Sequence, residues 1–348
     1  MKIESRKVAS PHGEITLFTL TNQSGASVTL STLGAGIVDV TVPDREGRME
    51  NVALAYADPA DYMADGPCLG KVPGRYANRI ARGYLNIDGC VHRLAVNNGP
   101  NHLHGGPDGF QNHIWEAEAL EDGVRFTLVS PDGHEHYPGT VKAAATYRWN
   151  DRNELTLTLE AETDAPTVVN LTNHAYWNLD GADAGSALEH LLKMKANRWL
   201  PTDRTLIPTG ELAFVADTPM DFAEAKPVGR DIEADFPALK YGKGYDNCWI
   251  IDDWAPGRMT EDAVVLRSEK SGRTLRMDTD QPGVQIYSGN WLSGSPLNRS
   301  GRSYEDYEGI AIEAQGFPDA PNRPEFPTQR VDPAHPYRRT IRYRFTAD

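Results

Sequence analysis

Alternation of apolar and polar side chains is the dominant pattern along this chain. Apolar residues occupy every second position in several short runs, at residues 27–31, 124–128, 154–160 and 341–345. A period of two places alternate side chains on opposite faces of a β-sheet, so each run predicts a strand. The runs are separated by turn-forming pairs, among them Asp88-Gly89, Asp122-Gly123 and Asp132-Gly133.

Helical periodicity is scarce. The pattern permits a short helix or helical turn only over Ala187–Lys195 and Ile232–Phe236. No glycine-rich turn opens into a long amphipathic helix, so the chain offers no place for a dinucleotide or P-loop site. Because the strand pattern continues from end to end without a composition shift, we predict one all-β, predominantly antiparallel domain over residues 1–348.

Prolines crowd the stretch Glu313–Pro336, which contains six of them. Each proline lacks the N–H donor that an interior strand needs. The aromatic and acidic side chains of Phe317, Asp319 and Phe326 favour an ordered surface or site loop over a linker.

Composition indicates which ligands and cross-links are not expected. The 348 residues carry 35 Lys plus Arg against 49 Asp plus Glu, a formal charge of −14, which argues against nucleic-acid binding. The three cysteines, Cys68, Cys90 and Cys248, lack a Cys-x-x-Cys spacing. Structural zinc and a disulfide framework are therefore not expected, and a reducing compartment fits.

The N-terminal segment does not match a secretory signal. Charged Glu4, Arg6 and Lys7 interrupt the stretch that would have to be apolar, and no run of 18 apolar residues follows anywhere. We expect a cytoplasmic protein without a membrane span.

Two polar clusters in the first third could bind a ligand. Asn78 and Arg79 offer hydrogen bonds to hydroxyl groups, although Arg79 could equally hold a loop by an ion pair. His104 precedes two glycines, which allow the backbone to approach a ligand closely.

Paired histidines raise the question of a metal. His102 and His104 could share one strand face, but cysteine partners are absent and zinc would need further ligands. His134 and His136 repeat the spacing in an Asp-Gly context that is typical of a surface. We therefore predict no metal site.

Four candidates lie in the remaining two thirds. His174 follows an apolar run, where it is either a site residue or a satisfied core histidine. Asp246 stands at the mouth of an apolar strand, as a site acid or a turn former. Glu313 follows Ile310-Ala311-Ile312, so we expect it to leave a strand and point into the proline-rich loop, either paired or in a site. Gln285 is either a site amide or an edge-strand amide.

Taken together, these side chains describe a polar cleft without a nucleophilic Ser or Cys triad. Aromatic faces that meet C–H surfaces, with charged or amide groups for hydroxyls, suit sugar recognition. A histidine and a carboxylate can move protons in opposite directions in one site.

The chain resembles the aldose 1-epimerase family. The resemblance rests on five ordered motifs, namely residues 74–80 (GRYANRI), 101–106 (NHLHGG), 173–179 (NHAYWNL), 283–285 (GVQ) and 318–320 (PDA). It implies a large antiparallel β-supersandwich. It also implies Glu313 as general base, His174 as general acid, and substrate binding by Asn78, Arg79, His104, Asp246 and Gln285. Trp177 and Gln111 depart from the Phe and Asp usual in the family, which leaves sugar preference open.

The implied reaction interconverts the α and β anomers of a free aldose such as glucose or galactose, without cofactor. Glu313 takes the proton of the C1 hydroxyl while imidazolium His174 protonates the ring oxygen. The acid must be charged near neutral pH, against an ordinary pKa of ~6.5, and Asp246 would favour the charged form. The implied partner is a monosaccharide, bound by a monomer or homodimer.

Three alternatives stay open. A hexose-6-phosphate 1-epimerase of the same fold would need an added basic cluster. A non-catalytic carbohydrate-binding protein would not need both Glu313 and His174, and a glycosidase would use two carboxylates. If the chain is an aldose 1-epimerase, we expect Glu313 and His174, which are 139 residues apart, to face each other across one pocket.

Overall fold

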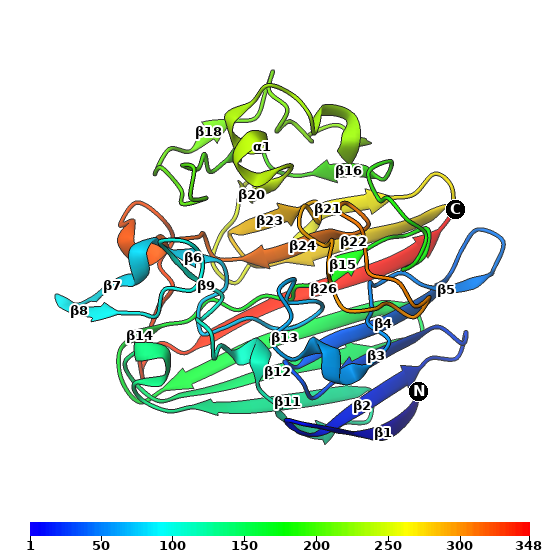
Figure 1. Ribbon diagram of the computed structural model, residues 1–348, viewed down its shortest axis with the longest axis horizontal. Coiled ribbons are helices and arrows are strands. Elements are labelled where there is room, and N and C mark those ends of the chain that lie inside the picture. The colour runs from blue at the N-terminus through cyan, green and yellow to red at the C-terminus, as the bar shows by residue number, and fades with distance from the viewer.

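The computed structural model describes residues 1–348, and its regular structure is dominated by antiparallel strands (Figure 1). A nine-stranded sheet forms the centre of the molecule. Its strand order is β10 (Glu116–Ala119), β11 (Gly123–Ser130), β12 (Val141–Trp149), β13 (Glu154–Thr163), β26 (Tyr337–Ala347), β22 (Arg273–Thr279), β21 (Thr260–Arg267), β16 (Leu191–Met194) and β19 (Lys226–Pro227).

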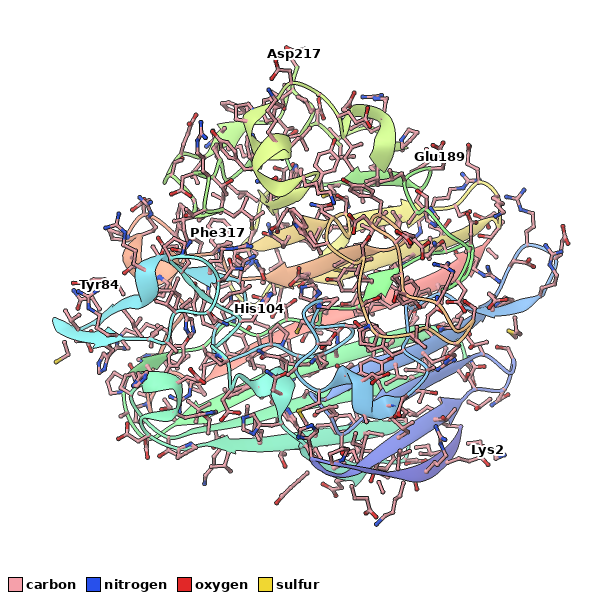
Figure 2. All side chains as sticks on the ribbon, viewed as in Figure 1. Lys2, Tyr84, His104, Glu189, Asp217 and Phe317 are labelled. Carbon is pink, nitrogen blue, oxygen red and sulfur yellow. The ribbon has the colours of Figure 1, made fainter.

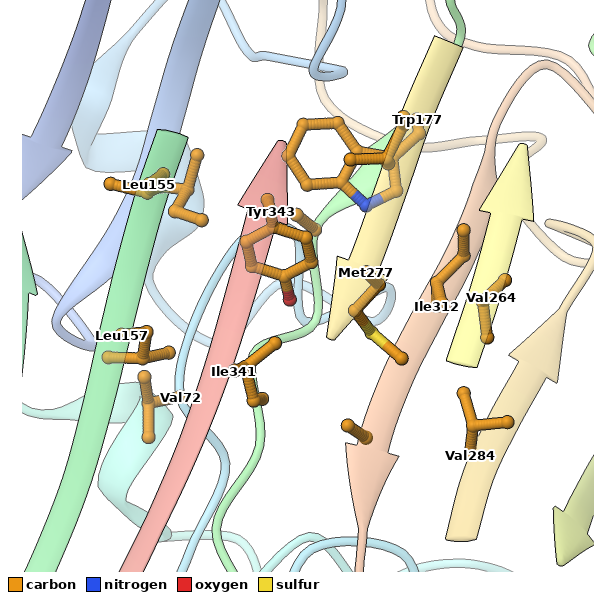
Figure 3. Packing of buried hydrophobic residues seen from close by; sticks show 14 of the residues in the cluster. Val72, Leu155, Leu157, Trp177, Val264, Met277, Val284, Ile312, Ile341 and Tyr343 are labelled. Carbon is orange, nitrogen blue, oxygen red and sulfur yellow. The ribbon is translucent and has the colours of Figure 1, made fainter. Parts of the chain in front are cut away.

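A six-stranded sheet packs on one part of the nine-stranded sheet. Its order is β15 (Tyr176–Trp177), β24 (Ile310–Gln315), β23 (Gly283–Tyr287), β20 (Asp246–Ile250), β17 (Arg198–Trp199) and β18 (Ala213–Phe214). The core between the two sheets is apolar. Figure 3 shows Val284 and Ile312 of the smaller sheet beside Val264 and Met277 of the larger one. This two-layer packing buries one face of each sheet.

The N-terminal residues form a third sheet of five strands. Its order is β1 (Lys2–Ser10), β2 (Gly13–Thr21), β3 (Ser27–Ser31), β4 (Gly36–Pro43) and β5 (Met49–Asn51). Phe18 of β2 meets Phe126 of β11 edge to face, with ring centroids 6.2 Å apart. The third sheet therefore shares its core with the nine-stranded sheet, and together the layers make a large antiparallel β-supersandwich.

The remaining elements are short. Three two-stranded ladders pair β6 (Arg79–Ile80) with β9 (His102–Leu103), β7 (Tyr84–Ile87) with β8 (Cys90–Arg93), and β14 (Thr167–Val168) with β25 (Arg330–Val331). The single α-helix is α1 (Pro237–Gly242). The 3₁₀ turns are η1 (Pro59–Tyr62), η2 (Ala81–Gly83), η3 (Phe110–Asn112), η4 (His134–His136), η5 (Val228–Asp231) and η6 (Ala320–Asn322).

The strand predictions are confirmed. All four alternating runs lie in strands, namely β3, β11, β13 and β26. The Asp88-Gly89 pair connects β7 to β8, and both residues have positive φ, as a tight hairpin turn requires. The proline-rich stretch is ordered, since Phe317 and Phe326 are buried against each other.

Neither of the two helix predictions is confirmed. A helix over Ala187–Lys195 is wrong, because residues 191–194 form β16 and pair with β21. There the sheet's unpaired edge outweighs a weak local preference for helix. Ile232–Phe236 forms a turn and bend between η5, which ends at Asp231, and α1, which begins at Pro237. The helical residues therefore lie on either side of the predicted range. No helix in the structure has the length and apolarity that crossing a bilayer requires.

We predict that the core of the nine-stranded sheet dominates stability. Leu157 lies opposite Ile341 in the sheet and is fully buried. Leu157→Ala should lower the free energy of unfolding by about 2–5 kcal/mol, because it removes buried methyl groups and leaves a cavity. Urea denaturation measures the change. Val129→Ala, at a position 60% exposed on β11, is the control and should change it by no more than ~0.5 kcal/mol. Equal effects would contradict this assignment of the core.

Candidate active site

One face of the six-stranded sheet forms the floor of a pocket. In β24, Ile310, Ile312 and Ala314 belong to the main core, so the alternation turns Glu313 to the opposite face. Glu313 lies directly across from Gln285 on β23, and Asp246 on β20 lies across from Tyr287. Three neighbouring strands thus present acids, an amide and a phenol on one surface.

Loops from distant parts of the chain build the walls. They enclose a cavity of about 560 Å³, whose lining includes Asn78, Arg79, Asn98, His104, His174, Tyr176, Arg204, Tyr241, Asp246, Tyr287, Trp291 and Glu313. Six of the seven predicted site residues are in this lining. Figure 2 labels His104 among the loops on the side of the sheets where β6 and β9 lie.

Glu313 and His174 meet at the floor. The His174 Nε2 atom is 3.5 Å from Glu313 Oε1, and the two side chains are 6% and 2% exposed. The backbone N–H of His174 donates to the Lys71 carbonyl at 2.9 Å, which fixes the loop before β15. The other two polar atoms, His174 Nδ1 and Glu313 Oε2, are buried without a hydrogen-bond partner in the protein. Buried polar atoms without partners are rare, so the pair has hydrogen-bonding capacity that the protein itself does not use.

Burial controls the charge of this pair. It lowers the pKa of His174 to about 4 and raises the pKa of Glu313 well above its ordinary range. Asp246 adds to the rise for Glu313 through like-charge repulsion, while the Arg79 guanidinium opposes it. Burial therefore favours the uncharged form of each group, a neutral imidazole beside a protonated carboxyl.

This differs from the expectation of an imidazolium in the free protein. Asp246 does raise the pKa of His174, as expected, but loss of water around the ring outweighs it. Sequence reasoning identified the neighbouring charge and could not weigh it against depth of burial.

Asp246 is fixed by two donors. Gln285 Nε2 donates to Asp246 Oδ1 at 2.6 Å, and Arg79 Nη2 lies 3.4 Å from Asp246 Oδ2. Arg79 Nε also donates to Asn98 Oδ1 at 3.1 Å. Gln285 is thus the one predicted residue outside the pocket lining, and it supports Asp246 from the adjacent strand. Its strand, β23, is interior, so the edge-strand reading is wrong.

Asn78 and His104 hold each other in place. The Asn78 backbone N–H donates to His104 Nδ1 at 3.1 Å, and the His104 backbone N–H donates to the Asn78 carbonyl at 3.1 Å. Since Nδ1 accepts, a neutral His104 carries its proton on Nε2. Burial also lowers the pKa of His104, with a contribution from His174, whose ring centroid is 5.3 Å away.

The suggested His102–His104 metal pair is wrong. β9 ends at Leu103 and His104 has a φ of 52°, so the two side chains do not share a strand face. His102 is buried, and its two ring nitrogens lie 2.6 Å from the Ala95 carbonyl and from the Tyr137 hydroxyl. It is a satisfied core histidine.

The structure also places Glu313, Trp177 and Gln111, about which the sequence raised expectations. Glu313 lies inside β24 and points from the sheet face to His174, not into the proline-rich loop. Trp177 faces the core and packs on Tyr343, with ring centroids 5.3 Å apart. Gln111 is buried outside the pocket lining. The two departures from the family pattern therefore do not line the pocket.

Sequence reasoning did not assign several lining residues to the site. Tyr176 and Tyr287 surround His174, with ring centroids 5.1 and 6.4 Å from the imidazole. At the mouth, Trp291 is 62% exposed and Lys243 lies over its ring at 4.5 Å. Tyr287 shares the strand period of Gln285, a signal that could have identified it. Arg204 comes from a loop and Tyr241 from the short helix α1, and neither segment carries such a signal.

Comparisons with known proteins show which proteins this chain is similar to. The aldose 1-epimerase family model matches residues 16–344. The chain is 38% identical to galactose mutarotase of Bos taurus over 90% of this chain and 89% of that protein. It is 37% identical to aldose 1-epimerase of Escherichia coli over 95% of each. Among solved structures, the GalM/aldose epimerase homologue from C. elegans superposes with a TM-score of 0.87 at 31% identity, covering 99% of both chains.

We predict that His174 stays neutral in the sugar-free protein at pH 5.5, because burial lowers its pKa to about 4. Nitrogen-15 NMR of labelled histidines measures the charge, with His174→Asn assigning the signal. The urea-unfolded protein is the control, in which the ring should titrate near ~6.5. An imidazolium signal for His174 at pH 5.5 in the folded protein would contradict the prediction.

Proposed function

The chain belongs to the aldose 1-epimerase family and interconverts the α and β anomers of a free aldose, and we propose that Glu313 and His174 carry the proton transfers. One observation supports this assignment above all. These two groups, 139 residues apart in the sequence, converge to 3.5 Å at the floor of one pocket. The C1 hydroxyl and the ring oxygen of an aldopyranose share one carbon, so acid and base must act in one small region.

Ring opening requires two transfers. Glu313 accepts the proton of the C1 hydroxyl, and His174 donates a proton to the ring oxygen, so the C1–O5 bond breaks and an open-chain aldehyde forms. Rotation about C1–C2 presents the other face of the carbonyl. The reverse transfers then close the ring to the opposite anomer and restore both groups.

The pair holds one proton in either arrangement. Protonated Glu313 with neutral His174 carries the same net charge as ionised Glu313 with imidazolium His174. Moving that proton across the 3.5 Å contact converts the resting form into the reactive one. A sugar hydroxyl that donates to the unpartnered Glu313 Oε2 stabilises the ionised carboxylate. Substrate binding thus favours the reactive arrangement.

The remaining polar residues bind the sugar. We propose that Arg79, Asp246, His104 and Asn78 hold ring hydroxyls, while Gln285 keeps Asp246 in position. Glucose and galactose are the aldoses proposed as substrates. Because the chain supplies both the acid and the base, we propose that no metal or nucleotide enters these steps.

We predict that the acid and base dominate kcat. Glu313→Gln and His174→Asn should each lower kcat by about 10²–10⁴-fold, the usual size of a general acid–base contribution. Arg79→Ala and His104→Ala should mainly raise KM, because they remove binding made in both ground and transition states. Polarimetry of freshly dissolved α-glucose or α-galactose measures both constants after subtraction of the spontaneous rate. His335→Asn, at an exposed histidine, is the control. Near-normal turnover in Glu313→Gln would refute the assignment.

We predict that kcat/KM falls as the pH is lowered through about 4. The pH profile of kcat/KM reports the free enzyme, in which the pKa of His174 is about 4. Below that pH the pair gains a second proton and Glu313 can no longer act as base. Above about pH 5 His174 is neutral and the raised pKa of Glu313 keeps the single proton on the pair, so kcat/KM should reach a plateau there. An acid limb with its midpoint near ~6.5 would instead indicate a histidine with an ordinary pKa.

A further inference from the structure

A second cluster of ligating side chains lies outside the sugar pocket. Asp108, His113 and His134 place one ligand atom each within 4.8 Å of the others. His113 Nε2 is 3.3 Å from Asp108 Oδ1, and His134 Nε2 is 3.1 Å from Asp108 Oδ2. His136, which the sequence pairs with His134, is not part of this cluster.

The two nitrogen–oxygen contacts, which go to different oxygens of Asp108, are close to the spacing around a tetrahedral zinc ion, and small side-chain shifts would bring the three ligand atoms from within 4.8 Å to that spacing. With Zn–N and Zn–O bonds of about 2.0–2.2 Å, neighbouring ligand atoms around the metal are about 3.3–3.6 Å apart. The two imidazole rings are nearly perpendicular, with centroids 5.3 Å apart and an interplanar angle of 87°. Both Nε2 atoms lie within 3.3 Å of the same carboxylate.

Neighbouring groups orient two of the three ligands. Ser130 Oγ lies 2.8 Å from His134 Nδ1 and accepts from the buried Arg75 Nε at 2.9 Å. With a lone pair still free, Ser130 can accept from Nδ1–H, which leaves Nε2 of His134 free to bind a metal. Glu135 Oε1 accepts from the Asp108 backbone N–H at 2.7 Å and fixes the loop that carries the carboxylate.

His113, the third ligand, would lose one hydrogen bond when it binds the metal. His113 Nε2 also lies 3.0 Å from the Asp108 backbone carbonyl, to which it donates when it carries its proton. Metal binding would release that proton and place the carbonyl oxygen close to the ion. Asp108 is 64% exposed at its side chain, so the cluster is open to solvent and to an incoming ion.

We propose that Asp108, His113 and His134 bind one zinc ion, with water in the open position. Two imidazoles and one carboxylate suit zinc, whereas calcium and magnesium prefer sites made of oxygen ligands. This site is separate from the proton-transfer pair and from the cofactor-free reaction. The ion would join the loop after η3 and the loop around Asp108 to η4. His104 of the sugar pocket lies four residues before Asp108, so the ion would fasten one wall of the pocket to the body of the protein.

Zinc binding to the full-length protein tests the proposal. After removal of metals with EDTA and dialysis, zinc chloride is titrated in competition with a chromogenic zinc chelator. We expect one zinc per chain. Asp108→Asn, His113→Asn and His134→Asn should each weaken binding by at least about 10–100-fold, the size of effect seen even for outer-shell partners.

The matched control is His136→Asn, which removes a histidine of the same turn outside the cluster. It should bind zinc as tightly as the wild type. Added zinc should raise the melting temperature of the wild type and of His136→Asn by several degrees and leave the three cluster variants unchanged. The metal-free melting temperatures of all variants show whether each still folds. Absence of one-to-one binding in the wild type, or equal loss in His136→Asn, overturns the proposal.

Discussion

A buried carboxyl and a buried imidazole that lie 3.5 Å apart impose the main constraint on this structure. Charging either group alone is unfavourable, because protonating His174 at its buried position costs roughly 3 kcal/mol more than in water, given its pKa of about 4. Glu313 is raised in pKa for the same reason. The pair is therefore stable only as a net neutral unit. The fold must hold both members at the same depth, because displacement of either would leave a buried group without its counterpart.

The sheet meets this constraint through its register. Glu313 and Gln285 face each other across β24 and β23, and Asp246 extends the row on β20. Apolar residues alternate with them and enter the core, so the same side-chain packing that stabilises the sandwich orients the polar row. Residues built on interior strands are placed more precisely than residues on loops. His174 comes from a loop, but its backbone is hydrogen-bonded to the Lys71 carbonyl.

The sequence indicates much of this arrangement, and the reasons for its failures are physical. Period-two runs predict the strands because burial of one sheet face leaves a local signal. The residues of the row, Asp246, Gln285 and Glu313, could be chosen because polar side chains interrupt apolar strands. The state of charge could not be predicted, since it depends on how deeply the assembled loops bury His174. Arg204 and Tyr241 were missed for a related reason: the loop that carries Arg204 and the helix α1 that carries Tyr241 reach the pocket through tertiary packing alone. Asp108, His113 and His134 likewise come together only in the fold.

A site for epimerisation must accept two substrates that differ at one carbon. The hydroxyls on the rest of the ring keep their positions, so fixed partners such as the Asp246–Arg79 pair can serve both anomers. The C1 hydroxyl, in contrast, lies in two different directions relative to the ring. In the mechanism that we propose, a proton that can reside on Glu313 or on His174, with no change in net charge, allows the same pair to open one anomer and close the other. Burial of the pair would then not oppose the reaction, because neither direction creates a new net charge in the pocket.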